Sequence, residues 1–140
     1  ASALCRASSF KEAESLALES LDFCDLLSQK GKSPRSLSIA ARKRLEISRA
    51  LATKPELLLL DETAAGLNPA ELDEAIALIQ RILHRGVTII VVEHIMKVVM
   101  SISNRIHAIN YGETIAEGTP EEVASNTEVI EAYLGKEAYT

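Results

Sequence analysis

Residues 57–68 read Leu57-Leu58-Leu59-Leu60-Asp61-Glu62-Thr63-Ala64-Ala65-Gly66-Leu67-Asn68. Four consecutive leucines predict a strand that is buried on both faces, a pattern typical of parallel sheets. The strand ends in two adjacent carboxylates, Asp61 and Glu62, at the edge where open α/β sheets bind their ligands. At a nucleotide site, one such carboxylate holds magnesium and the other orients the attacking water. Taken alone, the dipeptide fits an acidic, solvated loop equally well.

The composition of the chain is that of a globular domain. It has 140 residues, of which 47% are apolar and 25% charged, and this length is enough to bury a core. The net charge of −5 argues against a generally basic nucleic-acid-binding protein. Positive charge gathers between Lys30 and Arg49, which suits either a polyphosphate ligand or a solvated helix face.

Cysteine usage and hydropathy bear on the cellular location of the protein. Cys5 and Cys24 lack the spacing of metal ligands, which favours a reduced, cytoplasmic protein. No apolar run approaches the roughly 18 residues that a membrane-spanning helix needs. We therefore expect a chain that does not itself span a membrane.

Predicted helices alternate with predicted strands along the chain. Capping residues and helical spacing predict helices at about residues 10–29, 38–53, 69–85 and 95–102, from residue 119, and at 126–134. A second buried strand is predicted at residues 87–92, which are β-branched almost throughout. Residues 105–117 predict an antiparallel hairpin that turns at Tyr111-Gly112. Strands that alternate with helices predict an α/β fold.

Four features follow one another in a fixed order: Leu37-Ser38 before a basic helix, Asp61-Glu62 after a strand, Ala65-Gly66-Leu67-Asn68 before a capped helix, and Glu93-His94 after the next strand. Their order and spacing closely resemble the C-terminal half of an ABC transporter ATPase subunit. The tail at residues 111–123 resembles the same family, and residues 130–135 resemble the branched-chain amino acid importer type. The resemblance covers nearly the whole chain from Glu12 onward.

The resemblance implies roles for five residues. Asp61 matches the Walker B aspartate that holds Mg2+, and Glu62 matches the catalytic glutamate that polarises the attacking water. His94 matches the switch histidine that senses the γ-phosphate. Ser38 matches the signature-motif serine that contacts ATP bound to the partner subunit. Asn68 takes the D-loop position that communicates across the dimer.

The implied fold is a partial P-loop NTPase (ABC ATPase) fold of class α/β, in which helices flank parallel strands and a β-hairpin with further helices follows. Residues 1–54 would be the remainder of the helical subdomain, with a degenerate signature motif. Residues 55–140 would be the C-terminal part of the ATPase core, with Walker B, the D-loop and the switch histidine, as one structural unit.

Some positions depart from the family pattern. The signature glycines are replaced in Leu37-Ser38-Ile39-Ala40-Ala41, and we expect these side chains to crowd the backbone approach to phosphate. Thr63 stands where proline is usual, and Ile95 where aspartate is usual. Gly31-Lys32-Ser33 resembles the end of a P-loop, but no strand precedes it, so we interpret it as a helix-ending turn. Walker A and the Q-loop would lie upstream of Ala1.

The first functional interpretation is the C-terminal portion of an ABC transporter ATP-binding protein, which in its complete form couples ATP hydrolysis to import of branched-chain amino acids. ATP and Mg2+ are expected to bind only to the complete protein, so we expect the chain alone to be inactive. The expected partners are a second ATPase subunit, as homo- or heterodimer, and transmembrane permease subunits, without nucleic acid. The expected location is cytoplasmic, peripheral on the inner face of the cell membrane.

Two other interpretations stay open. The first is a stand-alone truncated module that acts in protein–protein interaction without ATPase activity. The second is the ATPase of a lipopolysaccharide-export-type ABC system, whose tail resembles this one. The two carboxylates, Asp61 and Glu62, are compatible with each of these interpretations.

Overall fold

The computed structural model describes residues 9–134, which divide into two compact units between Glu93 and His94. The predicted segment boundary at residues 54/55 lies inside the first unit, and the assignment of residues 1–54 to a helical subdomain stays a prediction. None of the helices within residues 9–134 combines the length and hydropathy that a membrane crossing requires.

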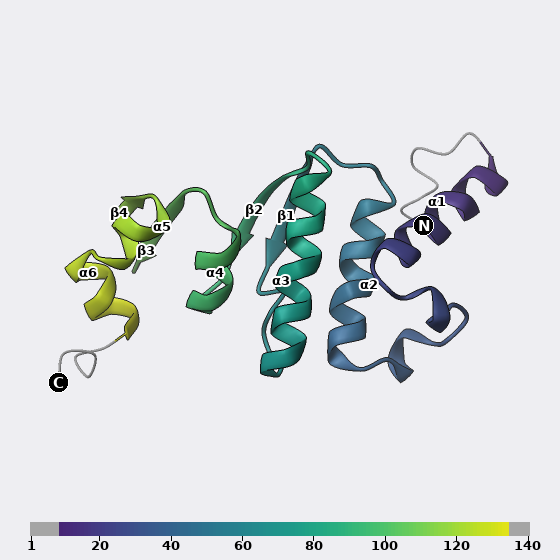
Figure 1. The fold of residues 1–140 in the computed structure, drawn as a ribbon, viewed down its shortest axis with the longest axis horizontal. Coiled ribbons are helices and arrows are strands. Elements are labelled where there is room, and N and C mark those ends of the chain that lie inside the picture. The colour runs from purple at the N-terminus through teal and green to yellow at the C-terminus, as the bar shows by residue number, and fades with distance from the viewer. Residues whose placement is uncertain (1–8, 135–140) are drawn as a thin grey trace. The chain divides into compact units, whose positions relative to one another are not determined.

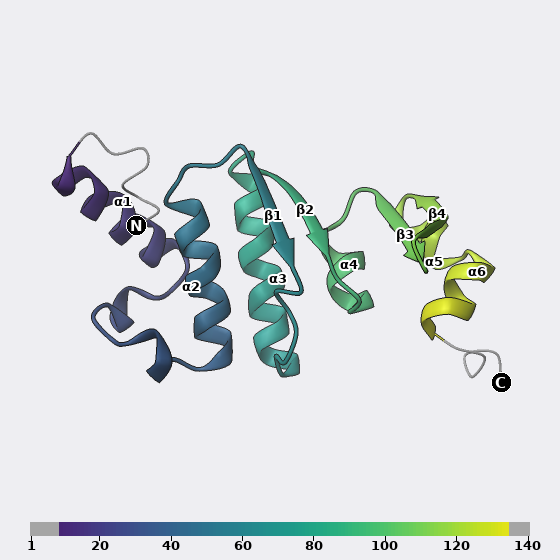
Figure 2. The same ribbon diagram turned by 180° about the vertical axis from the view of Figure 1, so that it is seen from behind.

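Within residues 9–93, the first unit has three long helices and a pair of strands, and two short 3-10 helices lie between the first and second long helices. Its elements are α1 (Phe10–Phe23), α2 (Ile39–Leu51), β1 (Leu57–Asp61), α3 (Pro69–His84) and β2 (Thr88–Val92). Helix α3 lies against one face of the strand pair, with α2 beside it (Figures 1 and 2). The strands are parallel and pair in register from Leu57 with Thr88 to Asp61 with Val92, so the predicted parallel arrangement is confirmed.

Helix α1 is shorter than predicted, since it ends at Phe23 rather than near residue 29. The helix stops where Asp25 takes the left-handed backbone conformation, with φ of 57°. After a short 3-10 helix (Leu27–Gln29), Gly31 turns the chain with φ of 90° into a second one (Pro34–Ser36). The stretch that resembles the end of a P-loop is therefore a turn, as expected, but it joins two short 3-10 helices rather than ending α1.

Side-chain caps begin the other two long helices at the predicted residues. Ser38 accepts a hydrogen bond from the Ala41 N–H (3.2 Å) at the start of α2. Asn68 and Glu71 form a reciprocal capping box at the start of α3. Gly86 follows α3 with φ of 80°, which favours glycine and ends the helix.

The buried residues of α3 extend beyond the apolar stripe that the sequence predicts. Helical spacing in the sequence predicts an apolar stripe of Leu72, Ile76, Ile79 and Leu83 on this helix. Leu78 and Ile82 lie outside that stripe and are also buried, at 2% and 0% exposed. The reason is that α3 packs on two sides, against the strand pair and against α2 (Figure 1).

The prediction that the leucine strand is buried on both faces is wrong for this structure. Leu58 and Leu60 are buried, but Leu57 and Leu59 are 50% and 68% exposed. On the neighbouring strand, two more apolar side chains are exposed, Ile90 at 54% and Val92 at 61%. Side chains alternate between the faces of a strand, and α3 covers only one face of this pair (Figure 2). The other face is an apolar surface, defined by Leu57, Leu59, Ile90 and Val92.

The second unit contains a hairpin and short helices. Its elements are α4 (Met96–Ile102), β3 (Ile106–Asn110), β4 (Glu113–Gly118), α5 (Pro120–Ala124), α6 (Thr127–Val129) and a π-helical turn (Ile130–Leu134). The strands β3 and β4 pair in antiparallel, and Tyr111 and Gly112 turn between them with φ of 48° and 86°, so the predicted hairpin is confirmed. Ala108, Val123 and Val129 form its small core. The predicted stop of the last helix at Gly135 lies outside the described residues.

Candidate functional site

The two carboxylates that the sequence singles out lie at the carboxyl end of β1. Asp61 is the last residue of the strand, and both Asp61 and Glu62 are exposed. The Glu62 N–H donates to the Val92 carbonyl oxygen (2.9 Å), one bond beyond the ladder of the two strands. The carboxyl end of this strand pair therefore presents two adjacent acids to solvent.

Glu62 has an unusual backbone. Its φ is 46°, in the left-handed region that non-glycine residues adopt only at a cost of about 1–3 kcal/mol. The Glu62 carbonyl oxygen accepts a hydrogen bond from the Lys43 Nζ of α2 (3.0 Å) and one from the Ala65 N–H (3.3 Å). With the bond to Val92, these contacts hold the backbone of Glu62 on both sides.

The loop after Glu62 is also held by Glu93, which directly follows β2 and for which the sequence predicts no role of its own. Glu93 Oε1 accepts a hydrogen bond from the Ala64 N–H (2.8 Å). Glu93 Oε2 and Thr63 Oγ1 are both buried, and neither has a hydrogen-bond partner within residues 9–134. The signal that could have indicated Glu93 is its position at the tip of the second parallel strand, next to the tip that carries Asp61-Glu62.

The start of the signature-like helix lies near the loop that leads into α3. A Cβ built on Gly66 would lie 3.9 Å from Ile39 Cγ2, and Gly66 itself has φ of 78°. Ile39 is 48% exposed beside Ser38, so the predicted crowding side chain stands in solvent at the helix start. Ala40 and Ala41 are instead buried, and they form part of the core rather than an exposed phosphate loop.

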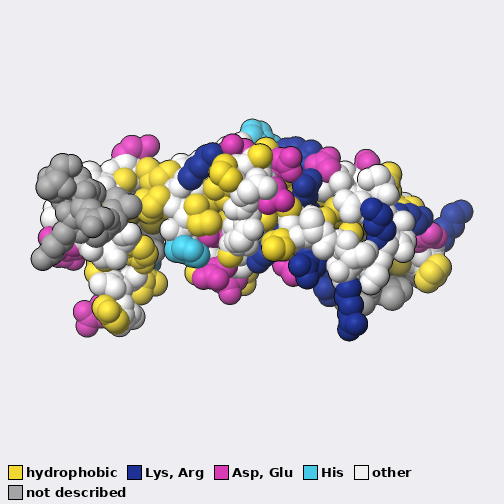
Figure 3. Space-filling view, turned by 90° about the horizontal axis from the view of Figure 1, so that it is seen from below, with side chains coloured by type: hydrophobic (Ala, Val, Ile, Leu, Met, Phe, Trp, Pro, Cys, Tyr) yellow, Lys and Arg dark blue, Asp and Glu magenta, His cyan; other side chains and the backbone are white. Residues whose placement is uncertain are grey.

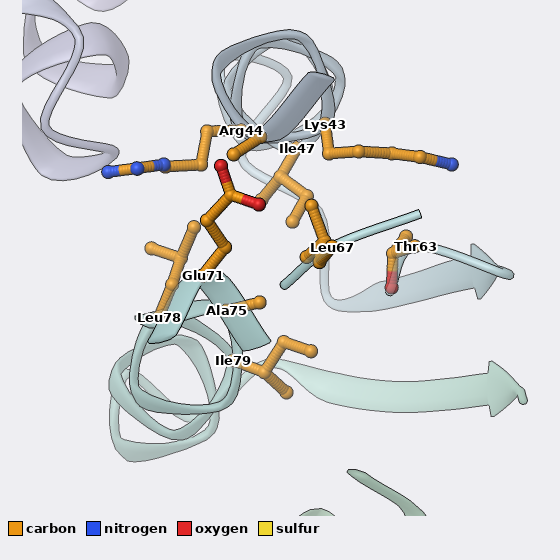
Figure 4. A pocket seen from close by; sticks show the side chains of 10 residues that line it. Lys43, Arg44, Ile47, Thr63, Leu67, Glu71, Ala75, Leu78 and Ile79 are labelled. Atoms are coloured by element: carbon orange, nitrogen blue, oxygen red, sulfur yellow. The ribbon is translucent and has the colours of Figure 1, made fainter. Parts of the chain in front are cut away.

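An apolar cavity lies between α2, α3 and the loop after β1, and Figure 4 shows Leu67 and Ile47 pointing toward each other in it. Its volume is about 10 Å3, close to the space of a single water molecule, so it does not accommodate a nucleotide. On its rim, Arg44 of α2 and Glu74 of α3 form an ion pair (2.8 Å) that joins the two helices. The candidate nucleotide contacts therefore lie on exposed edges rather than in this cavity.

The structure places four of the five predicted site residues in the first unit. Ser38 caps α2, Asp61 and Glu62 end β1, and Asn68 caps α3. Lys43 joins the helix that Ser38 begins to the backbone of Glu62. His94 is exposed and begins the second unit, directly after Glu93.

Charge is distributed unevenly over the molecule. Figure 3 shows Lys and Arg side chains gathered over one end of the first unit. The exposed basic residues of the predicted patch are Lys30, Lys32, Arg35, Arg42 and Arg49. Within residues 9–134, no group of three or more His, Cys, Asp or Glu side chains could hold a metal ion. Mg2+ at nucleotide sites is usually bound by one or two carboxylates with phosphates and waters, so the exposed Asp61 fits one position of such a set.

Comparisons with known proteins agree with this geometry. Residues 8–65 match the family model described as ABC transporter, and residues 113–139 match the model described as branched-chain amino acid ATP-binding cassette transporter. The high-affinity branched-chain amino acid transport ATP-binding protein LivG of Salmonella typhimurium is 44% identical over 142 residues, covering 96% of this chain and 55% of LivG. BraF of Pseudomonas aeruginosa, with the same description, is 44% identical over 127 residues, covering 90% of this chain and 50% of BraF. The chain thus spans about half the length of these curated relatives.

Solved structures give the same fold. A nucleotide-free ATP-binding cassette from an ABC transporter superposes with a TM-score of 0.82 at 26% identity, over 92% of this chain and 52% of that one. The ADP conformation of another ATP-binding cassette superposes with a TM-score of 0.80 at 25% identity, over 95% and 59%. The fold is therefore a partial P-loop NTPase fold of the ABC ATPase kind, and the chain belongs to the family of ABC transporter ATP-binding proteins. Within that family, the model matched by residues 113–139 and the relatives LivG and BraF are described by branched-chain amino acid transport.

Proposed function

We propose that this chain is the C-terminal portion of an ABC transporter ATP-binding protein that, when complete, couples ATP hydrolysis to the import of branched-chain amino acids. One observation carries the proposal: β1 ends in two exposed carboxylates, and the backbone of Glu62 is held in a left-handed conformation by Val92 and Lys43. The cargo follows from the relatives LivG and BraF, which are described as branched-chain amino acid transport proteins.

In this proposal, Glu62 acts as the base that polarises the attacking water, and Asp61 holds Mg2+. When bound, Mg2+ supplies positive charge that neutralises the charge developing on the phosphates. An exposed carboxylate on a fixed backbone suits the role of Glu62, because the water must be oriented before the reaction begins.

The remaining three residues would act at the nucleotide and across a dimer. Ser38 begins α2, where free backbone N–H groups favour an anion, and would contact the γ-phosphate of ATP on the partner subunit. Asn68 would communicate across the dimer, and His94 would sense the γ-phosphate. Ile39 is exposed beside Ser38, and its side chain would restrict how closely the phosphate approaches.

The phosphate cradle would come from outside this chain. Gly31-Lys32-Ser33 forms a turn between 3-10 helices and does not follow a strand, so it lacks the context of a P-loop. We propose that ATP and Mg2+ bind only to the complete protein, which dimerises, associates with transmembrane permease subunits and works at the cytoplasmic face of the membrane.

Glu62→Gln in the complete protein tests the proposal. The amide keeps the size of the side chain but cannot act as a base, so hydrolysis is expected to stop while ATP stays bound. Glu56→Gln, an exposed acid at the opposite end of β1, is the matched control and is expected to hydrolyse ATP like the wild type. A Glu62→Gln variant with the wild-type turnover would refute the assignment.

Two further measurements test the scope of the proposal. Calorimetry on the chain alone is expected to detect no tight binding of MgATP, and micromolar binding would contradict the missing cradle. Uptake of labelled leucine by cells that carry the complete protein is expected to be lost with Glu62→Gln. Unchanged uptake beside lost ATPase activity would point to another cargo.

A further inference from the structure

Ala64 lies in the loop that follows Glu62, and its backbone N–H is shut off from water. The residue is only 2% exposed, and the preceding Thr63 is buried as well. A buried N–H needs a hydrogen-bond partner, and the partner here is a side chain, Glu93 Oε1 at 2.8 Å. The loop after the carboxylate pair therefore depends on one carboxylate from the neighbouring strand.

This contact continues the connection of the two strands beyond their ladder. The last paired residues are Asp61 and Val92, and the Glu62 N–H adds one more bond to the Val92 carbonyl. Two residues later, the bond from Ala64 to Glu93 joins the two strand tips again. Glu62 lies between these two attachments, in a backbone conformation that persists only where its surroundings hold it.

We propose that Glu93 is a positioning residue for Glu62: its carboxylate fixes the Ala64 N–H and so holds the loop in the conformation that presents the Glu62 side chain. The inference rests on the proposed function, in which Glu62 is the base.

Glu93 Oε2 is buried and has no hydrogen-bond partner in the described residues. A buried, unpaired carboxylate oxygen is unfavourable, and such groups in native structures need an explanation. A glutamine at this position could accept the same bond from the Ala64 N–H through its amide oxygen, whereas an alanine could not. The two substitutions of Glu93 therefore differ in what they remove.

The test uses Glu93→Ala and Glu93→Gln in the complete ATP-binding protein, with Glu56→Ala as the matched control. Glu93→Ala removes the acceptor, so hydrogen exchange in peptides that contain Ala64 is expected to become about ten- to hundredfold faster. The value of kcat is expected to fall by about the same factor while KM for ATP changes little, since nucleotide contacts are left in place. Glu93→Gln keeps an acceptor oxygen and is expected to restore slow exchange and most of kcat.

Each outcome decides one claim. A Glu93→Ala variant with wild-type kcat, or with unchanged exchange at Ala64, would overturn the positioning role. Equal losses of kcat in Glu93→Ala and Glu56→Ala would overturn it too, because the effect would then not be specific to this bond. If the wild-type protein itself hydrolyses no ATP, the proposed function fails, and the exchange measurement still decides whether Glu93 holds the loop.

Discussion

Ser38→Ala removes the hydroxyl oxygen that accepts the N–H of Ala41 at the first turn of α2, a bond of 3.2 Å. Replacing an N-cap serine by alanine costs about 0.5–2 kcal/mol. Ser38 is exposed, so water can satisfy part of the lost bond, and we expect the lower half of that range, about 0.5–1 kcal/mol. Ala40 and Ala41 are buried, so packing keeps the helix in place and the loss stays local.

Three variants separate the cap from a contact with nucleotide. Ser38→Ala removes the hydroxyl that could both cap α2 and contact the nucleotide, and Ser38→Thr keeps a hydroxyl that can do both. Ser38→Asp keeps a cap acceptor, and its charge interacts favourably with the helix N-terminus, but it would repel a phosphate. Urea unfolding is expected to give aspartate and threonine variants close to wild type and a weaker alanine variant. The ATPase rate of the complete protein is expected to fall in the order Thr, Ala, Asp.

Two results would refute this reasoning. An alanine variant as stable as the wild type would show that the Ser38 hydroxyl does not cap α2 in solution. An aspartate variant that hydrolyses ATP as fast as the threonine variant would show that no phosphate approaches this helix start. In that case, the replaced signature residues Ile39, Ala40 and Ala41 would mark a site that does not contact nucleotide.

Two further predictions concern the core and the exposed sheet face. Burial raises the pKa of the Cys24 thiol from 9.0 to about 11, so the folded chain holds this proton more tightly than the unfolded chain. The free energy of unfolding should therefore show no contribution from Cys24 below pH 9 and should fall as the pH rises from 9 toward 11. In a Cys5→Ser background, Cys24→Ala should lack this fall, and rapid labelling of Cys24 by a thiol reagent at pH 8 would contradict its burial. The double variant Leu59→Thr, Val92→Thr should bind less of a hydrophobic fluorescent dye and should self-associate less in light scattering, when the chain is studied alone. Its free energy of unfolding should change by less than about 0.5 kcal/mol, because both side chains are already exposed. The same pair should destabilise the complete protein by about 2–4 kcal/mol if its additional sequence covers this face, and equal effects in both proteins would contradict that cover.

Local signals in the sequence located most of the elements correctly. The hydroxyl of Ser38, the Asn68–Glu71 capping box and Gly86 act within one turn of their own residue, so their effects do not depend on distant parts of the chain. The hairpin turn at Tyr111-Gly112 is local in the same sense. The exception is the end of α1, because the residue that takes the left-handed conformation there is Asp25, whereas glycine is the usual sequence signal for such an end.

Burial could not be predicted from the leucine run itself. The hydrophobicity of residues 57–60 is suited to cover on both faces, but the number of faces covered depends on which layers pack against the strand. In this structure, α3 lies on one face of the strand pair (Figure 2), and Leu58 and Leu60 are buried while Leu57 and Leu59 are exposed. The extra burial of Leu78 and Ile82 has the same origin, because α3 meets two neighbouring elements that are distant in sequence.

The sequence by itself determined that Asp61 and Glu62 lie at the end of a strand, that Ser38 and Asn68 begin helices, and that His94 comes after the next strand, because these features are set by neighbouring residues. Only the tertiary structure decided how Glu62 is held. Lys43 lies 19 positions before Glu62, and Glu93 lies 29 positions after Ala64. The pairing of β2 with β1 and the position of α2 beside α3 (Figure 1) bring these residues together. A hydrogen bond between residues so far apart forms only where folding has already placed donor and acceptor within about 3 Å of each other.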